Sequence, residues 1–258
     1  MSNLIKMDLH RMFKARSFKV CLILAFLISF CQMPVLKLVS MLLAMIPGTG
    51  SIAGLIPKRV NLSSLIGNPF PGINFMLMMF SACYFFYADL EHGFIKNIAG
   101  QMPKRGYTVL SKYLSSIVHN LIFVAVGIIG NVIGNVLIVK LVMDKDIMKM
   151  AGASCLRFLL AMGLTAILLL VVAALRSKTF GMVLTVIFGA EVLNLVYLGI
   201  DAAVLMAFKK SISIEKYMPD QLVWQSNPKL TLALPVAAVT ILVFLLLAIR
   251  IFDRRDVK

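Results

Sequence analysis

Residues that could take part in catalysis are few and scattered in this sequence. A P-loop requires the string G-x-x-x-x-G-K-[ST], whose backbone amides and lysine cradle phosphates, and the sequence contains no such string. The H-E-x-x-H string of zinc hydrolases is also absent, and His10, His92 and His119 lie far apart in the chain. We therefore expect no cofactor and no metal in this chain, and no ATP hydrolysis by the chain alone.

Two S-x-x-K strings, at residues 213–216 and 226–229, have the spacing found in some serine acyl enzymes. Such an enzyme also needs oxyanion donors and companion motifs on a folded domain. Both strings fall in residues 209–229, which we expect to be a loop outside the membrane. We interpret them as chance matches, and we expect that the protein is not an enzyme.

Ionisable residues inside apolar stretches are more informative, because a charge at mid-bilayer is costly and usually faces protein or water. Glu191 is the deepest of them. If residues 179–208 form one continuous helix, Asn194 and Asp201 lie about 60° and about 80° from Glu191 around its axis. The three residues then share one polar face, which either hydrogen-bonds to neighbouring helices or lines a translocation path.

The elements that position these residues must be membrane helices. The chain is 60% hydrophobic and 14% charged, whereas soluble domains are about a quarter charged. Its apolar blocks are long enough for a hydrocarbon core of ~30 Å, which takes ~20 helical residues. We predict an all-α polytopic membrane protein with a single transmembrane domain and six spans within residues 18–251. The spans are expected at about residues 19–45, 70–88, 113–142, 153–175, 179–208 and 230–251.

The expected third span carries a ridge of small residues, Gly127, Gly130 and Gly134, flanked by Asn131 and Asn135. Small residues at this spacing let two membrane helices approach closely, and the amides can hydrogen-bond across the contact. We predict that this ridge packs against another helix.

Charge sets the expected orientation. Lys and Arg number 26 against 11 Asp and Glu, a net charge of +15. Most of the basic residues fall in segments that six spans would place on one side, which the positive-inside rule makes cytoplasmic, near anionic lipid headgroups. We predict a multi-pass protein of the cell membrane with both termini cytoplasmic, including a cytoplasmic tail at residues 252–258. Nucleic-acid binding is disfavoured, since no recognition motif accompanies the basic residues.

Residues 1–17 are expected to form an amphipathic helix in the membrane interface. The basic residues Lys6, Arg11 and Lys14 lie largely opposite the apolar face, and Asp8 lies at its edge. An ordinary basic flank to the first span is the alternative. The apolar face comprises Leu4, Ile5, Leu9, Met12 and Phe13.

The polar stretch after the second span has a specific pattern, Ala88-Asp89-Leu90-Glu91-His92-Gly93-Phe94-Ile95-Lys96-Asn97-Ile98. It resembles the signature of bacterial type 2 ABC exporter permeases, in which an acidic pair, a glycine and Ile-Lys-Asn precede a basic residue and a lysine that opens the third span. Arg105 and Lys112 match those later positions. The opening Lys6-Met-Asp-Leu-His-Arg11, with Arg16-Ser-Phe18, resembles the N-terminal elbow helix of the family, and Phe252-Asp253-Arg254-Arg255-Asp256 resembles its usual ending.

The chain is most similar to small permeases of Gram-positive bacteria that confer antimicrobial-peptide resistance, including lantibiotic immunity and bacitracin-type systems. The resemblance implies a homodimer or heterodimer of six-helix subunits, driven by two separate cytoplasmic ATPase subunits that bind ATP and Mg²⁺. The exported substrate would be a hydrophobic or amphipathic peptide antibiotic or a lipid-like compound. The residues expected to couple the permease to the ATPase are Asp89, Glu91, Gly93, Lys96 and Asn97.

Two other function classes stay open. One is an ATP-independent secondary transporter that uses Glu191 or Asp201 as a proton or cation site. The other is a membrane-embedded enzyme, which the lack of a reactive constellation disfavours. A neighbouring gene for a P-loop ATPase would favour the exporter over the carrier.

Overall fold

The chain is described by a computed structural model at residues 2–44, 59–68, 72–91, 106–138, 140–208, 213–225 and 228–254. These residues are almost entirely helical, as predicted. The long helices are α2 (Arg16–Ala44), α4 (Gly72–Glu91), α6 (Gly106–Val136), α7 (Ile147–Leu175) and α11 (Leu230–Arg254). The shorter elements are α1 (Ser2–Lys14), β1 (Arg59–Asn61), α3 (Leu62–Gly67), β2 (Lys140–Val142), α8 (Lys178–Gly189), α9 (Val192–Phe208), η2 (Ile214–Tyr217) and α10 (Pro219–Trp224).

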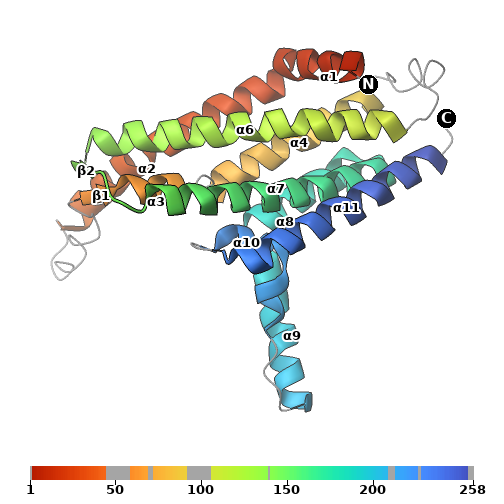
Figure 1. Ribbon diagram of the computed structural model, residues 1–258. Helices are drawn as coiled ribbons and strands as arrows, with labels where there is room; N and C mark the ends of the chain where they lie inside the picture. The colour runs from red at the N-terminus through yellow and green to blue at the C-terminus, as the bar shows by residue number, and fades with distance from the viewer. Residues whose placement is uncertain are drawn as a thin grey trace.

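The five long helices run side by side as a bundle, with both ends of the chain near one end of it (Figure 1). We call this the terminal end; α3, β1 and β2 lie at the opposite end. Each long helix belongs to a stretch long and apolar enough to cross a membrane, and α8 and α9 together would make a sixth. The prediction of a helical protein with several potential spans is confirmed. The count of six stays a prediction.

Several helix boundaries differ from those predicted. Residues 89–112 were expected to form a polar connection, but α4 continues to Glu91 and α6 begins at Gly106. Polar residues alone do not end a helix, and the first strong helix breaker after Ala88 is Gly93. The helix of the third span ends at Val136, and the residues that follow include β2, which pairs in parallel with β1.

The predicted loop regions at residues 46–69 and 209–229 contain short helices. Ser154 on α7 donates a hydrogen bond to the carbonyl of Ile66. The buried Arg157, also on α7, donates to the carbonyls of Gly67 and Gln225. These carbonyls lie at the C-terminal ends of α3 and α10, where a helix has no intrahelical donors. One guanidinium therefore holds both short helices against the start of α7.

The predicted glycine ridge of α6 packs against α2. A Cβ at Gly130 would lie 2.8 Å from the Ser29 Cβ and 3.0 Å from the Phe26 carbonyl oxygen. A Cβ at Gly134 would overlap the carbonyl oxygen of Phe30. The prediction of close helix packing is therefore confirmed at these two glycines, where no side chain larger than hydrogen fits without movement.

The fifth predicted span is not one continuous helix. It is broken between α8 and α9, whose axes are bent by 67°. Glu191 at the break has a φ of 54°, a left-handed conformation that cannot continue a right-handed helix. Beyond the break, α9 stands away from the bundle (Figure 1). The turn before this span is tight, since Arg176 ends α7 in the left-handed conformation and α8 begins at Lys178.

Candidate functional site

An ion cluster at the terminal end of the bundle centres on Asp89, in the last turn of α4. Its Oδ1 lies 2.7 Å from Arg11 Nη2 on α1, and its Oδ2 lies 2.8 Å from Lys112 Nζ on α6. Only 5% of Asp89 and 6% of Lys112 is exposed. Burying a charge is costly unless it is paired and hydrogen-bonded, so the two basic residues allow α4 to carry a carboxylate there.

Lys112 is held by α4 at more than one point. Its ammonium group donates a hydrogen bond of 3.1 Å to the Phe85 carbonyl and lies 4.1 Å from the centre of the Phe85 ring. Phe85 is one helical turn before Asp89, so all three contacts lie on one face of α4. The contacts fix the start of α6 relative to the end of α4.

Asp8 extends the cluster along α1. Its Oδ2 accepts a hydrogen bond of 2.6 Å from the Ser111 hydroxyl on α6, and only 3% of the residue is exposed. Burial raises the pKa of the Asp8 carboxyl above its ordinary value, and the charge of Lys112 partly offsets this effect. The four charged members, Asp8, Arg11, Asp89 and Lys112, are formally neutral together and join α1, α4 and α6.

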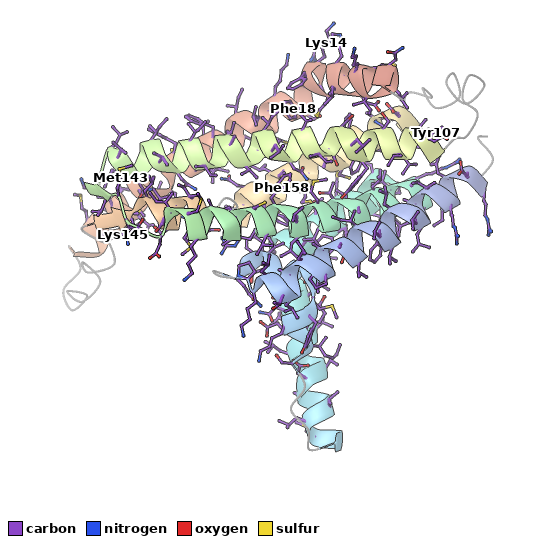
Figure 2. The ribbon with its side chains drawn as sticks, in the orientation of Figure 1. Lys14, Phe18, Tyr107, Met143, Lys145 and Phe158 are labelled. Carbon is purple, nitrogen blue, oxygen red and sulfur yellow. The ribbon has the colours of Figure 1, made fainter. Side chains whose placement is uncertain are left out.

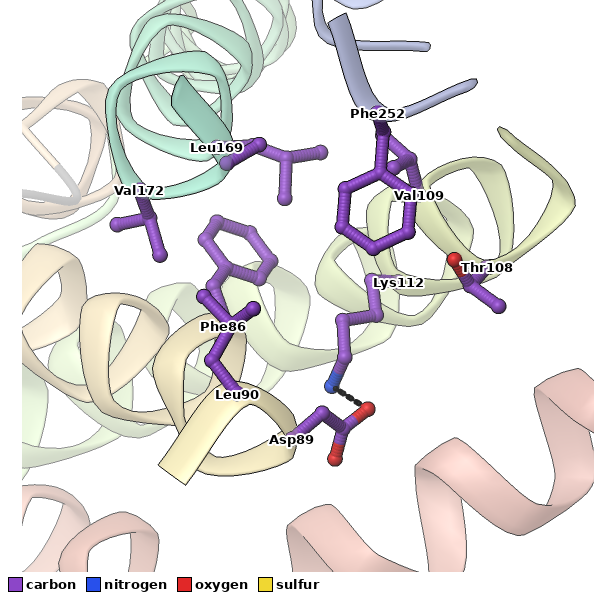
Figure 3. A pocket seen from close by; sticks show the side chains of 10 residues that line it. Phe86, Asp89, Leu90, Thr108, Val109, Lys112, Leu169, Val172 and Phe252 are labelled. Carbon is purple, nitrogen blue, oxygen red and sulfur yellow. Dashed lines mark ion pairs between the residues drawn. The ribbon is translucent and has the colours of Figure 1, made fainter. Parts of the chain in front are cut away.

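The ends of α7 and α11 also reach this region. A small cavity of about 30 Å³ lies beside Asp89 and Lys112, and its wall includes Val172 of α7 and Phe252 of α11 (Figure 3). Next to Phe252, Asp253 accepts a hydrogen bond of 2.5 Å from the backbone N–H of Gly106, the first residue of α6. Five helices therefore meet where α4 ends and α6 begins.

The predicted coupling residues fall into two groups. Asp89 is the buried centre of the ion cluster, and Glu91 is exposed as the last residue of α4. The other three, Gly93, Lys96 and Asn97, lie outside the described residues. The structure therefore shows how the end of α4 and the start of α6 are held, through Asp89 on one side and Gly106 on the other.

The residues assigned to the interfacial helix divide between two environments. Lys6 and Lys14 are exposed, and Lys14 points away from the bundle (Figure 2). Arg11, in contrast, is half-buried against Asp89. Asp8, expected at the edge of the apolar face, lies on the buried face of α1 in register with Leu4 and Met12. Whether α1 lies in a membrane interface stays a prediction.

The prediction that Glu191, Asn194 and Asp201 share one face of a continuous helix is wrong, because the helix is broken between α8 and α9. Glu191 is exposed in the break, and Asn194 is half-buried in the first turn of α9. Both oxygens of Asp201 accept the backbone N–H of Ile214, at 3.0 and 3.2 Å. Asp201 thus anchors the chain after α9, and a role of these residues in translocation stays a prediction.

A buried polar cluster in the bundle was not predicted. His119 Nδ1 lies 2.9 Å from Asn120 Oδ1, and its Nε2 lies 2.9 Å from the Ser81 hydroxyl. The Asn120 amide donates to the Thr165 hydroxyl at 3.0 Å. Three helices thereby share one satisfied network. The sequence signal for it was the helical spacing of polar residues 115, 116, 119 and 120 within an apolar block.

The long apolar helices and the buried ion cluster at one end of them are typical of a multi-pass helical membrane protein. In comparisons with known proteins, no family model matches this chain, and no curated protein matches it either. Among the described residues, no three His, Cys, Asp or Glu side chains group closely enough to hold a metal ion.

Proposed function

We propose that the chain is the membrane-spanning permease subunit of an ATP-driven ABC exporter, in which a separate cytoplasmic subunit binds ATP and Mg²⁺. The observation that carries this proposal is the neutral ion cluster of Asp8, Arg11, Asp89 and Lys112 at the end of α4. The cluster includes Asp89, the first acidic residue of the segment that resembles the coupling region of type 2 permeases. A partner that displaces this segment acts on α1, α4 and α6 together.

The contacts at the ends of that segment support a mechanical role. Asp89 is tied to α6 through a buried ion pair with Lys112 and to α1 through the half-buried Arg11, and Gly106 is tied to α11 through Asp253. Buried ion pairs resist separation, because breaking one leaves a buried charge without compensation. A displacement of the connection between α4 and α6 should therefore move these helices themselves, because the contacts at their ends hold their positions.

Charge supports the orientation in which the terminal end faces the cytoplasm of a bacterial cell. Exposed basic residues at this end include Lys6, Lys14, Arg16 and Arg254. Such residues favour the cytoplasmic side and suit an anionic lipid surface. The sequence resemblance further supports a dimer and export of a hydrophobic or amphipathic peptide antibiotic or lipid-like compound.

Site-specific photocrosslinking from Glu91 tests this proposal. A photoreactive amino acid at Glu91 should form an adduct with a P-loop ATPase in the producing cells, identified by mass spectrometry of the adduct. The same amino acid at Asp146, which is exposed at the opposite end of the bundle, is the matched control and should give no such adduct. Failure to recover an ATPase at Glu91, or equal recovery at Asp146, would reject the proposal.

A further inference from the structure

A groove lies between the N-terminal turns of α7 and the start of α11, and none of the ion-cluster residues lines it. Figure 1 shows α10 beside the start of α11. The groove volume of about 590 Å³ falls within the range of small-molecule sites, roughly 300 to 1,000 Å³. The walls are mostly apolar and include Leu156, Leu159 and Leu234. Gly152 opens one side, because a Cβ built there would meet no atom within 4 Å.

Two lysines flank this apolar groove. Lys149 lies in the first turn of α7, and Lys229 directly precedes α11. Both are exposed, neither makes an ion pair within the described part of the chain, and no acidic residue lines the groove. Asp146, one turn before Lys149, is not within ion-pair distance of it. The groove therefore combines apolar walls with a positive rim that the described residues leave uncompensated.

We infer that this groove binds one anionic phospholipid, with an acyl chain along the leucines and the phosphate between Lys149 and Lys229. Each part of the ligand matches one observation: the chain fits the apolar walls, and the phosphate complements the lysines. A zwitterionic lipid such as phosphatidylcholine has the same phosphate but adds a cationic group that the two lysines repel, and a cationic peptide is repelled by them as well. Since α7 and α11 are both long and apolar enough to cross a membrane, the ligand is at hand in the bilayer. The inference does not depend on the exporter proposal.

The test is native mass spectrometry of the purified full chain, titrated with dimyristoylphosphatidylglycerol or dimyristoylphosphatidylcholine in a neutral detergent. We expect preferential binding of one phosphatidylglycerol. Changing Lys149→Gln and Lys229→Gln together should weaken that binding by about 25-fold, since each lysine near a phosphate contributes roughly a fivefold factor. The matched control is Lys145→Gln with Lys216→Gln, two exposed lysines outside the groove, which should leave binding unchanged.

A steric variant tests the groove independently of charge. Gly152→Leu places a side chain in open space, so it should abolish lipid binding without lowering thermal stability. Equal affinity for the two lipids, equal loss in both lysine pairs, or full binding in Gly152→Leu would overturn the inference. If inorganic phosphate displaces phosphatidylglycerol, the groove would be a site for anions in general and not for a lipid. If the purified chain is instead a dimer without bound lipid, and Gly152→Leu dissociates that dimer, the groove would be the contact with a second copy of the chain.

Discussion

Asp89 on α4 and Lys112 on α6 meet at 2.8 Å while both are more than nine-tenths buried. The second oxygen of Asp89 is paired with Arg11, so one carboxylate links three helices. A buried carboxylate with two cationic partners is stable only while both helices hold their positions. This arrangement makes the end of α4 a joint between α1, α4 and α6.

Removing one member of the Asp89–Lys112 pair should cost more than removing both. Asp89→Leu alone leaves Lys112 buried without a carboxylate, which should destabilise the protein by about 3–5 kcal/mol. Asp89→Leu with Lys112→Met should cost clearly less than the sum of the two single changes, as measured by thermal unfolding in detergent. Glu91→Gln, at an exposed position, is the control and should have little effect. Additive losses would show that the pair is not coupled.

The contact between α6 and α2 should be sensitive to a single methyl group. Gly134→Ala places a Cβ against the carbonyl oxygen of Phe30, a backbone atom that cannot rotate away. We expect a loss of about 1–3 kcal/mol from overpacking, measured by thermal unfolding. Gly152→Ala is the matched helix substitution in open space and should be neutral or stabilising. Equal effects of the two changes would contradict the packing.

Docking of α1 should depend on pH through Asp8. Because burial raises the pKa of Asp8 in the folded protein above the ordinary value of 3.8, the folded state holds this proton more tightly than the unfolded state. The contribution of Asp8 to stability therefore improves as the pH falls through the folded pKa and is lost as the pH rises. Hydrogen exchange of α1 should show the wild type gaining protection relative to Asp8→Asn on acidification. A difference between the wild type and Asp8→Asn that stays unchanged across pH would reject this role.

The bend at Glu191 offers a test that separates backbone from charge. Its φ of 54° favours glycine, so Glu191→Gly should preserve or raise thermal stability, by up to about 1 kcal/mol. Glu191→Gln keeps the side-chain size and should leave stability unchanged, because the residue is exposed. If the carboxylate binds a cationic substrate or a proton, Glu191→Gln should reduce transport activity while leaving thermal stability unchanged. A large destabilisation by Glu191→Gly would show that the bend is not present.

The helical class could be predicted from the sequence because apolar blocks of about 20 residues match the length of a helix that crosses the hydrocarbon core. Sequence reasoning also flagged Asp89, since charges clustered beside a glycine stand out locally. It placed Arg11 opposite the apolar face of the N-terminal helix and Asp8 at the edge of that face, however, because their partners belong to α4 and α6 and no local pattern brings those helices together. Helical periodicity identified the glycine ridge for the opposite reason: the spacing of small residues is itself the signal.

The break at Glu191 lay beyond such reasoning. Residues 179–208 are apolar throughout except for a few side chains, and apolar composition is the same in a straight span and a bent one. Just before the break α8 approaches α4 so closely that a Cβ at Gly189 would lie 2.8 Å from the Met76 Cβ, and no local pattern brings these two residues together. The groove lysines were missed similarly, since Lys149 and Lys229 are neighbours only through the packing of α7 on α11.

The central claim, that this chain is an ATPase-driven permease coupled through the end of α4, is tested most directly by ATP turnover in reconstituted membranes. The isolated chain should hydrolyse no ATP, and turnover should appear when the copurifying ATPase subunit is added. Glu91→Lys should abolish the stimulation by this chain while leaving membrane insertion intact, whereas the charge reversal Asp146→Lys at the opposite end should not. Turnover by the isolated chain after removal of contaminants, or full stimulation by Glu91→Lys, would contradict the account.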